Sequence, residues 1–187
     1  MAALAGCGSS NTATTGPAIS RCTTAQLEAS LGEPRGTGGT TTDYPLNLRN
    51  TSTSTCTVQG YAGVSFVAGD DNHQIGHAAS RDTGSAPTIT LSHGQTASAT
   101  LGIVDAANFP PDCDPTSPTG LRVSPPDQTA SLVIDPAGIA CSNPKYTPLH
   151  VGPFESAQPQ PDTPLVRPAN RPSLLCAAWL LTSCRSA

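Results

Sequence analysis

Short runs of alternating apolar and polar residues, closed at both ends by turn residues, constrain this fold most strongly. The longest run spans residues 96–104. Its alternate residues share one face: Ala97, Ala99, Leu101 and Ile103. A period of two is that of a β-strand with one buried face, and such runs are typical of antiparallel sheets. Further short runs occupy residues 44–50, 64–67, 88–91, 121–124 and 131–134.

Turn residues are dense between these runs, with 17 glycines and 19 prolines in 187 residues. Clusters of them lie at 36–39, 69–72, 92–94, 110–112 and 124–127. Short strands with frequent turns predict an all-β fold, an antiparallel β-sandwich of about seven to nine strands. So many breakers leave little room for a helical bundle. The one helical candidate is 23–31, where Thr24 could be the N-cap, and an edge strand is the alternative there.

Charge and hydropathy exclude two classes of protein, a nucleic-acid-binding protein and a protein with a membrane-spanning helix. Charged residues make up 12% of it, and the net charge of −4 includes only nine Lys and Arg residues. A nucleic-acid-binding surface needs a concentration of positive charge, so no nucleic-acid partner is expected. No apolar run reaches the roughly 20 residues that a membrane-spanning helix needs.

The seven cysteines indicate the redox state of the cellular compartment in which the protein resides. None forms a C-x-x-C pair, so zinc-ribbon and thioredoxin-type sites have no support. Cys22, Cys56, Cys113 and Cys141 lie in the patterned part of the chain, at spacings that suit staples between strands. They allow three connectivities, of which we favour Cys22–Cys56 and Cys113–Cys141. Disulfides predict an oxidising, extracytoplasmic compartment, and buried free thiols in a reducing cytosol are the alternative.

The N-terminal sequence L-A-G-C, residues 4–7, resembles the lipobox of bacterial lipoproteins. In that family the cysteine is acylated and becomes the first mature residue, so Cys7 is the candidate lipid carrier. The small and polar residues that follow it read as a tether, which makes 1–19 an anchor segment. None of the six residues before Cys7 is basic, so a full signal peptide would have to begin further upstream. A chance match is the alternative.

Composition divides the rest of the chain in two. Residues 20–154 carry the alternating pattern and are the predicted β-sandwich domain. Residues 155–187 begin with a proline-rich stretch and end in a short apolar segment that contains Cys176 and Cys184. We predict that this tail is disordered, with a partner-docking segment as the alternative.

Several segments of the predicted domain together resemble a known family. The most specific is 56–64, which reads C-T-V-x-G-Y-x-G-V, and looser matches lie at 46–51, 91–97 and 121–126. They are similar to an actinobacterial cell-envelope family of secreted proteins and lipoproteins, the DUF 4232 family, whose domain has no known function. The resemblance implies an immunoglobulin-like sandwich, two disulfides and residence outside the plasma membrane. It implies no catalytic residues.

The best candidate for chemistry is the segment 70–77, which holds two carboxylates and two imidazoles. His73 and His77 could bind Zn²⁺ or Cu²⁺ from an exposed loop. Two imidazoles in a loop supply few preorganised ligands, so we favour a solvated hairpin tip.

The sequence predicts no catalytic residue and no cofactor. Metalloprotease, P-loop and dinucleotide-binding motifs are absent, and 63–67 lacks the closing glycine of a nucleophile elbow. Asp105, Asp112 and Asp114 lack the spacing of a calcium loop, which favours a polar loop pinned by a disulfide. Asn50 begins a glycosylation sequon, which matters only in a glycosylating host.

Together these patterns predict a non-enzymatic, exported and lipid-anchored protein of the cell envelope. Its domain would act as a structural or binding module. The membrane would be reached through the lipid anchor, and the other partner would be an envelope protein or a glycan. An extracytoplasmic metal-binding protein that uses the 70–77 loop is the alternative function.

The lipid anchor predicts how the protein partitions. With its native upstream start, the protein should enter the detergent phase and gain the mass of acyl chains. Each buried methylene of a chain adds about 0.8 kcal/mol to membrane binding. Replacing Cys7 (Cys7→Ser) should abolish both effects, measured by detergent phase separation and intact mass. A Cys7→Ser protein that still partitions fully would contradict the anchor.

Overall fold

The computed structural model describes residues 18–36 and 39–157. Its elements, in chain order, are η1 (Thr24–Gln26), β1 (Leu27–Leu31), β2 (Arg35–Gly36), β3 (Thr41–Asn50), β4 (Cys56–Val58), β5 (Gly63–Ala68), β6 (His73–Ile75), β7 (Ser80–Arg81), β8 (Ile89–Leu91), β9 (Thr96–Val104), η2 (Ala106–Asn108), η3 (Pro111–Cys113), β10 (Pro115–Thr116), β11 (Gly120–Ser124), β12 (Leu132–Ile134), β13 (Ala140–Cys141), β14 (Leu149–Val151) and β15 (Glu155–Ser156). The η elements are single 3-10 turns, and within the described ranges they are the whole helical content. The predicted all-β class is confirmed.

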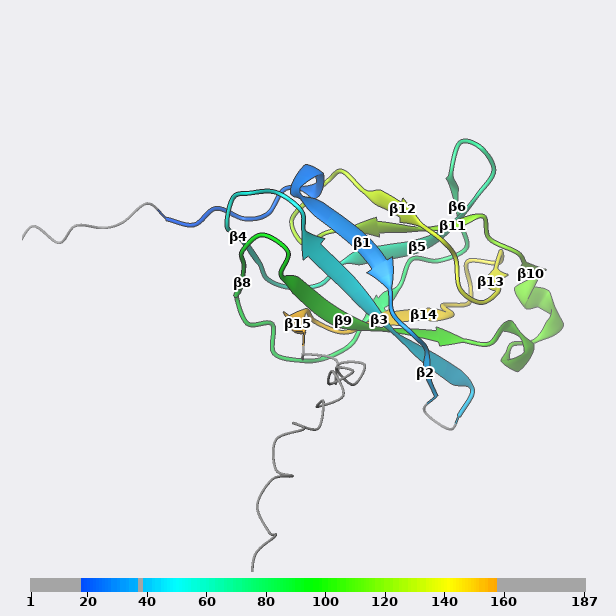
Figure 1. The fold of residues 1–187 in the computed structure, drawn as a ribbon. Helices are drawn as coiled ribbons and strands as arrows, with labels where there is room; N and C mark the ends of the chain where they lie inside the picture. Colours follow the sequence, from blue (N-terminus) through cyan, green and yellow to red (C-terminus); the bar gives the residue numbers. More distant parts are fainter. Residues whose placement is uncertain (1–17, 37–38, 158–187) are drawn as a thin grey trace, which may run out of the picture. The chain divides into compact units, whose positions relative to one another are not determined.

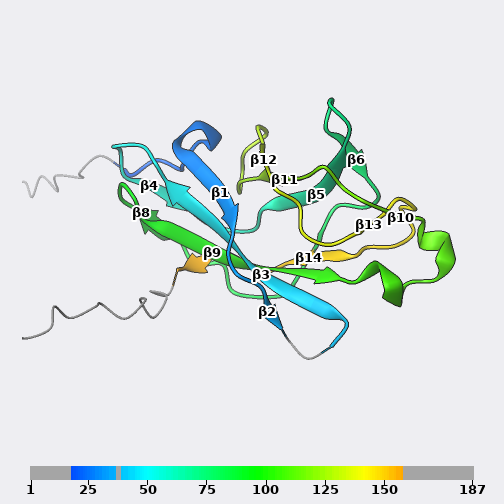
Figure 2. The same ribbon diagram turned by 45° about the vertical axis from the view of Figure 1, so that its right-hand side comes forward.

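The longest ladder of the fold joins β3 to β9. The two strands are antiparallel and pair from Thr41 opposite Val104 to Arg49 opposite Thr96. Figure 1 shows them side by side as the two longest arrows, and the turned view of Figure 2 agrees. Further strands join both of their outer edges, which gives a sheet in the order β1-β3-β9-β14-β7, with β2 beside β3 and β15 beside β9. We call it the large sheet.

A second sheet, in the order β12-β11-β5-β6, covers the apolar face of the large sheet. We call it the small sheet. Leu46 and Leu48 on β3 share one buried cluster with Phe66 on β5 and Leu121 on β11. Full burial of such a side chain contributes about 1.5–3 kcal/mol, so this shared core is what holds the two sheets together.

The strand predictions are confirmed in their faces as well as their places. The four residues predicted to share one face of 96–104 are all buried, with exposed fractions of 0–4%. The structure has more strands than predicted, because two-residue segments form strands without an alternating pattern of their own. Examples are β7, which pairs with β14, and β10, which pairs with β13.

Of the two predictions for 23–31, a helix or an edge strand, the structure has the edge strand. A single 3-10 turn precedes β1, and β1 pairs with β3 from Leu27 opposite Asn50 to Leu31 opposite Leu46. Leu27 is buried while Glu28 and Ser30 are exposed, which is a period of two. A helix this short is marginal by itself, whereas pairing with β3 satisfies the backbone and buries Leu27.

The predicted end of the domain at residue 154 is too early. Glu155 and Ser156 form β15 and pair with Ser98 and Ala97 on β9. Phe154, directly before them, is fully buried in the core. The described domain therefore continues to Ala157, while Cys7 and residues 158–187 lie outside the described residues.

Two disulfides lie in the domain, and they join the pairs that we favoured. Cys22 is bonded to Cys56, and Cys113 is bonded to Cys141, with sequence separations of 34 and 28 residues. All four side chains are buried. Loops of this length correspond to about 3.5–4 kcal/mol per bond in the chain-entropy model. The bonds indicate an oxidising, extracytoplasmic environment. Among the residues that the structure describes, none form a helix long and apolar enough to cross a membrane.

Asn50, the sequon residue, is a buried polar anchor at the end of β3. Its Nδ2 donates to the carbonyl oxygens of Ser54 (2.8 Å) and Leu91 (2.9 Å). Its Oδ1 accepts from the Ser52 backbone N–H over 3.0 Å. Because the side chain is fully buried and both amide hydrogens are used, the folded domain does not offer this asparagine to a glycosylating enzyme.

Replacing Asn50 should destabilise the fold more than replacing its neighbour on the opposite face of β3. Asn50→Ala removes the buried hydrogen bond to the Leu91 carbonyl and the part-buried bond to the Ser54 carbonyl, so we expect a loss of about 2–3 kcal/mol. Asn47→Ala, the matched control, should stay within about 0.5 kcal/mol of the parent. Urea unfolding of the oxidised protein measures both. Equal losses in the two variants would contradict the anchoring role of Asn50.

Candidate functional site

The hairpin between β5 and β6 carries the histidine pair that the sequence singled out. His73 begins β6, and its Nδ1 lies 2.9 Å from Asp71 Oδ1. This hydrogen bond holds the pKa of the Asp71 carboxyl below its usual value. His77 lies beyond the strand, with Nδ1 3.2 Å from the carbonyl oxygen of Ala78. In the described ranges, no group of three or more His, Cys, Asp or Glu side chains is placed to hold a metal ion.

The three aspartates near Cys113 have separate roles. Asp105 accepts a hydrogen bond from the Ala107 backbone N–H over 2.9 Å, at the start of η2. Asp114 ends η3 in the left-handed region, with φ of 53°. Asp112 accepts a hydrogen bond from the Tyr146 hydroxyl over 2.6 Å. This arrangement fits the polar, disulfide-pinned loop that we favoured over a calcium site.

The loops at the Cys113–Cys141 disulfide form a compact aromatic and charged group. We call it the Tyr146 cluster, and its members are Phe109, Asp112, Asn143, Lys145 and Tyr146. Besides the bond from Tyr146, Asp112 has Lys145 Nζ 3.6 Å from its Oδ2, and its carbonyl oxygen accepts from Asn143 Nδ2 over 2.8 Å. Lys145 Nζ lies 5.2 Å from the centroid of the Tyr146 ring, and the Phe109 ring centroid lies 5.4 Å from it.

The Tyr146 cluster holds two of the chain's few aromatic residues outside the main core. The chain has three Phe, three Tyr and one Trp. Phe66 and Phe154 are fully buried in the main core. Phe109 and Tyr146 are half-buried, and they pack on a small separate core of Ala106 and the two bonded cysteines. Partly exposed aromatics on a rigid support are typical of interaction surfaces.

The pKa shifts in the Tyr146 cluster favour the ordinary charge states of its members. The hydrogen bond from Tyr146 lowers the pKa of Asp112, and the same bond raises the pKa of Tyr146. Its contacts with Tyr146 and then Asp112 raise the pKa of Lys145. An activated lysine or tyrosine nucleophile needs a lowered pKa, and the pKa of Lys145 and that of Tyr146 are both raised.

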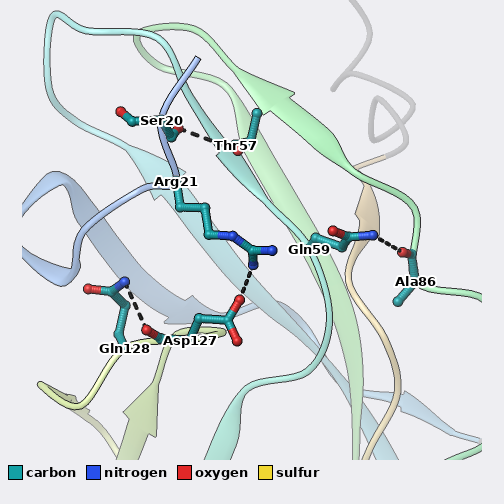
Figure 3. A network of polar contacts seen from close by, with 7 residues as sticks. All are labelled: Ser20, Arg21, Thr57, Gln59, Ala86, Asp127 and Gln128. Carbon is teal, nitrogen blue, oxygen red and sulfur yellow. Dashed lines mark hydrogen bonds and ion pairs between the residues drawn. The ribbon is translucent and has the colours of Figure 1, made fainter. Parts of the chain in front are cut away.

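The Tyr146 cluster lies at the opposite end of the domain from the point where the chain enters it. In Figures 1 and 2, the first described residues run in beside β4, and the loops around β10 and β13 lie at the far end. Figure 3 shows how the incoming segment is fixed: Arg21 pairs with Asp127, and the Thr57 hydroxyl donates to the Ser20 carbonyl oxygen. Nearby, the Gln59 amide donates to the Ala86 carbonyl oxygen over 3.1 Å. These contacts are structural.

A second polar group crosses the outer face of the large sheet, and no sequence pattern points to it. Strand register places five residues in one row, which we call the His150 row: Arg35 on β2, Asp43 on β3, Gly102 on β9, His150 on β14 and Ser80 on β7. Directly paired residues present their side chains on the same face of a sheet. Leu149 and Val151, on either side of His150, are fully buried, so His150 faces away from the core.

The imidazole of His150 is held from both sides. Its Nδ1 lies 2.8 Å from Oδ2 of Asp82, which follows β7. On the other side the ring lies over Gly102, where a Cβ atom would meet His150 Nε2 at only 1.9 Å. Any residue other than glycine at position 102 would therefore displace the ring. In the sequence, His150 is marked only by an apolar residue on either side. This pattern is too common to predict its contacts with Asp82 and Gly102.

Ser80 is not placed as a nucleophile for His150. In a Ser-His-Asp triad the carboxylate meets Nδ1 and the serine hydroxyl meets Nε2. Here Ser80 lies on β7, the Asp82 side of β14, and its hydroxyl donates to the Leu149 carbonyl oxygen over 3.4 Å. His150 Nε2 lies over β9, on the opposite side.

Comparison with known proteins gives the family. A family model described as a domain of unknown function, DUF4232, matches residues 22–155. The chain belongs to this family. No curated protein and no solved structure matches the chain. The DUF4232 match runs from Cys22 into β15, so it includes both disulfides, the Tyr146 cluster and the His150 row.

In this DUF4232 domain, we predict that the hydrogen bond from Tyr146 lowers the pKa of Asp112. A lowered pKa means that the carboxylate stabilises the loops above its ordinary pKa, and that this is lost as pH falls through the lowered value. Tyr146→Phe removes the hydroxyl that donates to Asp112, so the pKa of Asp112 should rise toward its usual value. Carboxyl-carbon NMR titration measures it. Tyr61→Phe is the matched control, since the Tyr61 hydroxyl bonds a backbone carbonyl instead. An unchanged Asp112 titration in Tyr146→Phe would contradict the contact.

Proposed function

We propose that this chain is an exported, lipid-anchored protein of an actinobacterial cell envelope, whose domain is a non-enzymatic binding or structural module. The two buried disulfides support export, because they suit an oxidising compartment. The lipobox-like sequence around Cys7 supports the anchor. An immunoglobulin-like arrangement of the two packed sheets is part of the proposal, and the partner is an envelope protein or a glycan.

The position of the Tyr146 cluster carries the proposal. It lies at the end of the domain away from residues 18–22, where the chain enters. An acylated Cys7 would attach the domain to the membrane through this entering end, so the cluster lies away from the point of attachment. The disulfide between Cys113 and Cys141 lies directly under the two rings, so the surface is held in place before a partner binds.

Two observations favour binding over catalysis. The pKa shifts of Asp112, Lys145 and Tyr146 all stabilise the ordinary charge states of these groups. Ser80 and His150 Nε2 lie on opposite sides of β14. The alternative function, metal binding in the 70–77 loop, has less support, because His73 and His77 each have a local hydrogen-bond partner.

Site-specific crosslinking in living cells tests the proposal. A photoreactive benzoylphenylalanine in place of Phe109 in the full chain should give a discrete adduct with an envelope component. Tyr146→Ala, which removes the ring beside it, should abolish that adduct. Lys145 is the only lysine of the chain, so its reactivity toward amine reagents should also fall on binding.

The matched control carries the same photoreactive residue in place of Val133. That side chain is 48% exposed and lies on β12, away from the Tyr146 cluster. It should give no such adduct. Equal labelling from both positions would contradict the proposed surface, and recovery of the protein inside the cell with four free thiols would contradict export.

A further inference from the structure

The His150 row holds polar groups that the described fold itself does not use. His150 Nε2 has no hydrogen-bond partner within the described ranges, and its side chain is 31% exposed. Asp43 and Arg35 form no hydrogen bond or ion pair with other described residues. By contrast, Asp82 is occupied by His150. The row therefore presents a carboxylate, an imidazole and a guanidinium to solvent on one face of a sheet.

The acceptor on His150 is preorganised. A carboxylate can only accept a hydrogen bond, so His150 Nδ1 donates to Asp82, and in the neutral tautomer that this bond selects Nε2 carries a lone pair. Gly102 lets the ring lie over β9, which directs Nε2 toward the side of the row where Asp43 lies. Fixing a polar group before binding lowers the entropy cost of using it.

The row has the length and chemistry of an extended polar ligand. Neighbouring strands lie about 4.8 Å apart, so a row from β7 to β2 spans about 19 Å. Nε2 and the Asp43 carboxylate accept hydrogen bonds, while Arg35 donates them. A ligand that both donates and accepts along its length matches this set, and hydroxyl groups do both.

A protein partner fits this row less well. Protein interfaces depend on buried aromatic or apolar anchors at their centre. The large exposed apolar side chains of the described residues are Ile19, Val133 and Ile139, and none of them belongs to the row. Two partly exposed aromatic rings lie together in the Tyr146 cluster instead.

We propose that the His150 row binds an oligosaccharide, with His150 Nε2 and Asp43 accepting from sugar hydroxyls and Arg35 donating to them. The inference rests on the proposed function as a binding module and names a ligand class for a second surface of the domain. Asp82 acts as a positioning residue for His150, and Gly102 leaves room for the ring.

Binding of defined oligosaccharides to the full, oxidised chain tests the inference. The probes are tetrasaccharides of N-acetylglucosamine, glucose, arabinose and galactose, titrated by NMR with the histidine ring nitrogens as the signal. At least one probe should bind and shift Nε2 of His150. His150→Ala and Asp43→Ala should each weaken it about tenfold, the value of one net hydrogen bond of about 1.4 kcal/mol. Asp82→Asn should weaken binding and change the ring tautomer, an effect that loss of packing alone would not give.

His93→Ala is the matched control, because its imidazole bonds the Ser52 carbonyl oxygen away from the row. It should bind the probe as the parent does. Absence of binding for every probe with the folded parent, or equal binding by His150→Ala, would overturn the inference. Crosslinking from position 109 would be unaffected by either result, so failure here is distinguishable from failure of the proposed function.

Discussion

The ladder between β3 and β9 is the constraint on which the rest of the structure depends. It is the longest pairing of the described domain, and every other strand of the large sheet joins one of its two edges directly or through a neighbour. A slip of one residue would turn Leu46 and Leu48 outward and bring Asn47 and Arg49 into the core. The register that buries the core therefore also fixes the polar residues on the outer face.

Both candidate surfaces lie next to this ladder: the His150 row is on its outer face, and the Tyr146 cluster is in the loops beyond its end. On its outer face, the same register that buries Leu101 brings Asp43, Gly102 and His150 into one row. At its far end, the chain leaves β9 into the turns η2 and η3, which lie outside the large sheet and are followed by the short β10–β13 ladder. There the Cys113–Cys141 disulfide provides the support on which Phe109 and Tyr146 pack. The two surfaces thus differ in chemistry: the His150 row is polar and lies on a sheet face, and the Tyr146 cluster contains aromatic rings and lies in loops.

The strands of the fold could be predicted from the sequence, whereas the two candidate surfaces could not, and the reason is physical. Alternation over 96–104 is a local signal, so its buried face could be predicted. His150 and Asp82 are 68 residues apart, and Tyr146 and Asp112 are 34 apart, so only the fold brings each pair together. The histidines that stand close in sequence, His73 and His77, lie on a hairpin and each bond a local partner. Proximity in sequence singled out these two imidazoles, whereas the contact between His150 and Asp82 exists only in the fold.

Native-state hydrogen exchange of the oxidised protein tests this account most directly. If the β3–β9 ladder is the frame, the paired amides at the centre of these two strands should exchange most slowly of all, through global unfolding alone. The amides of η2, η3 and β13 should exchange faster, through local opening. The account would be contradicted if β3 and β9 exchanged as fast as those loops while the small sheet stayed protected.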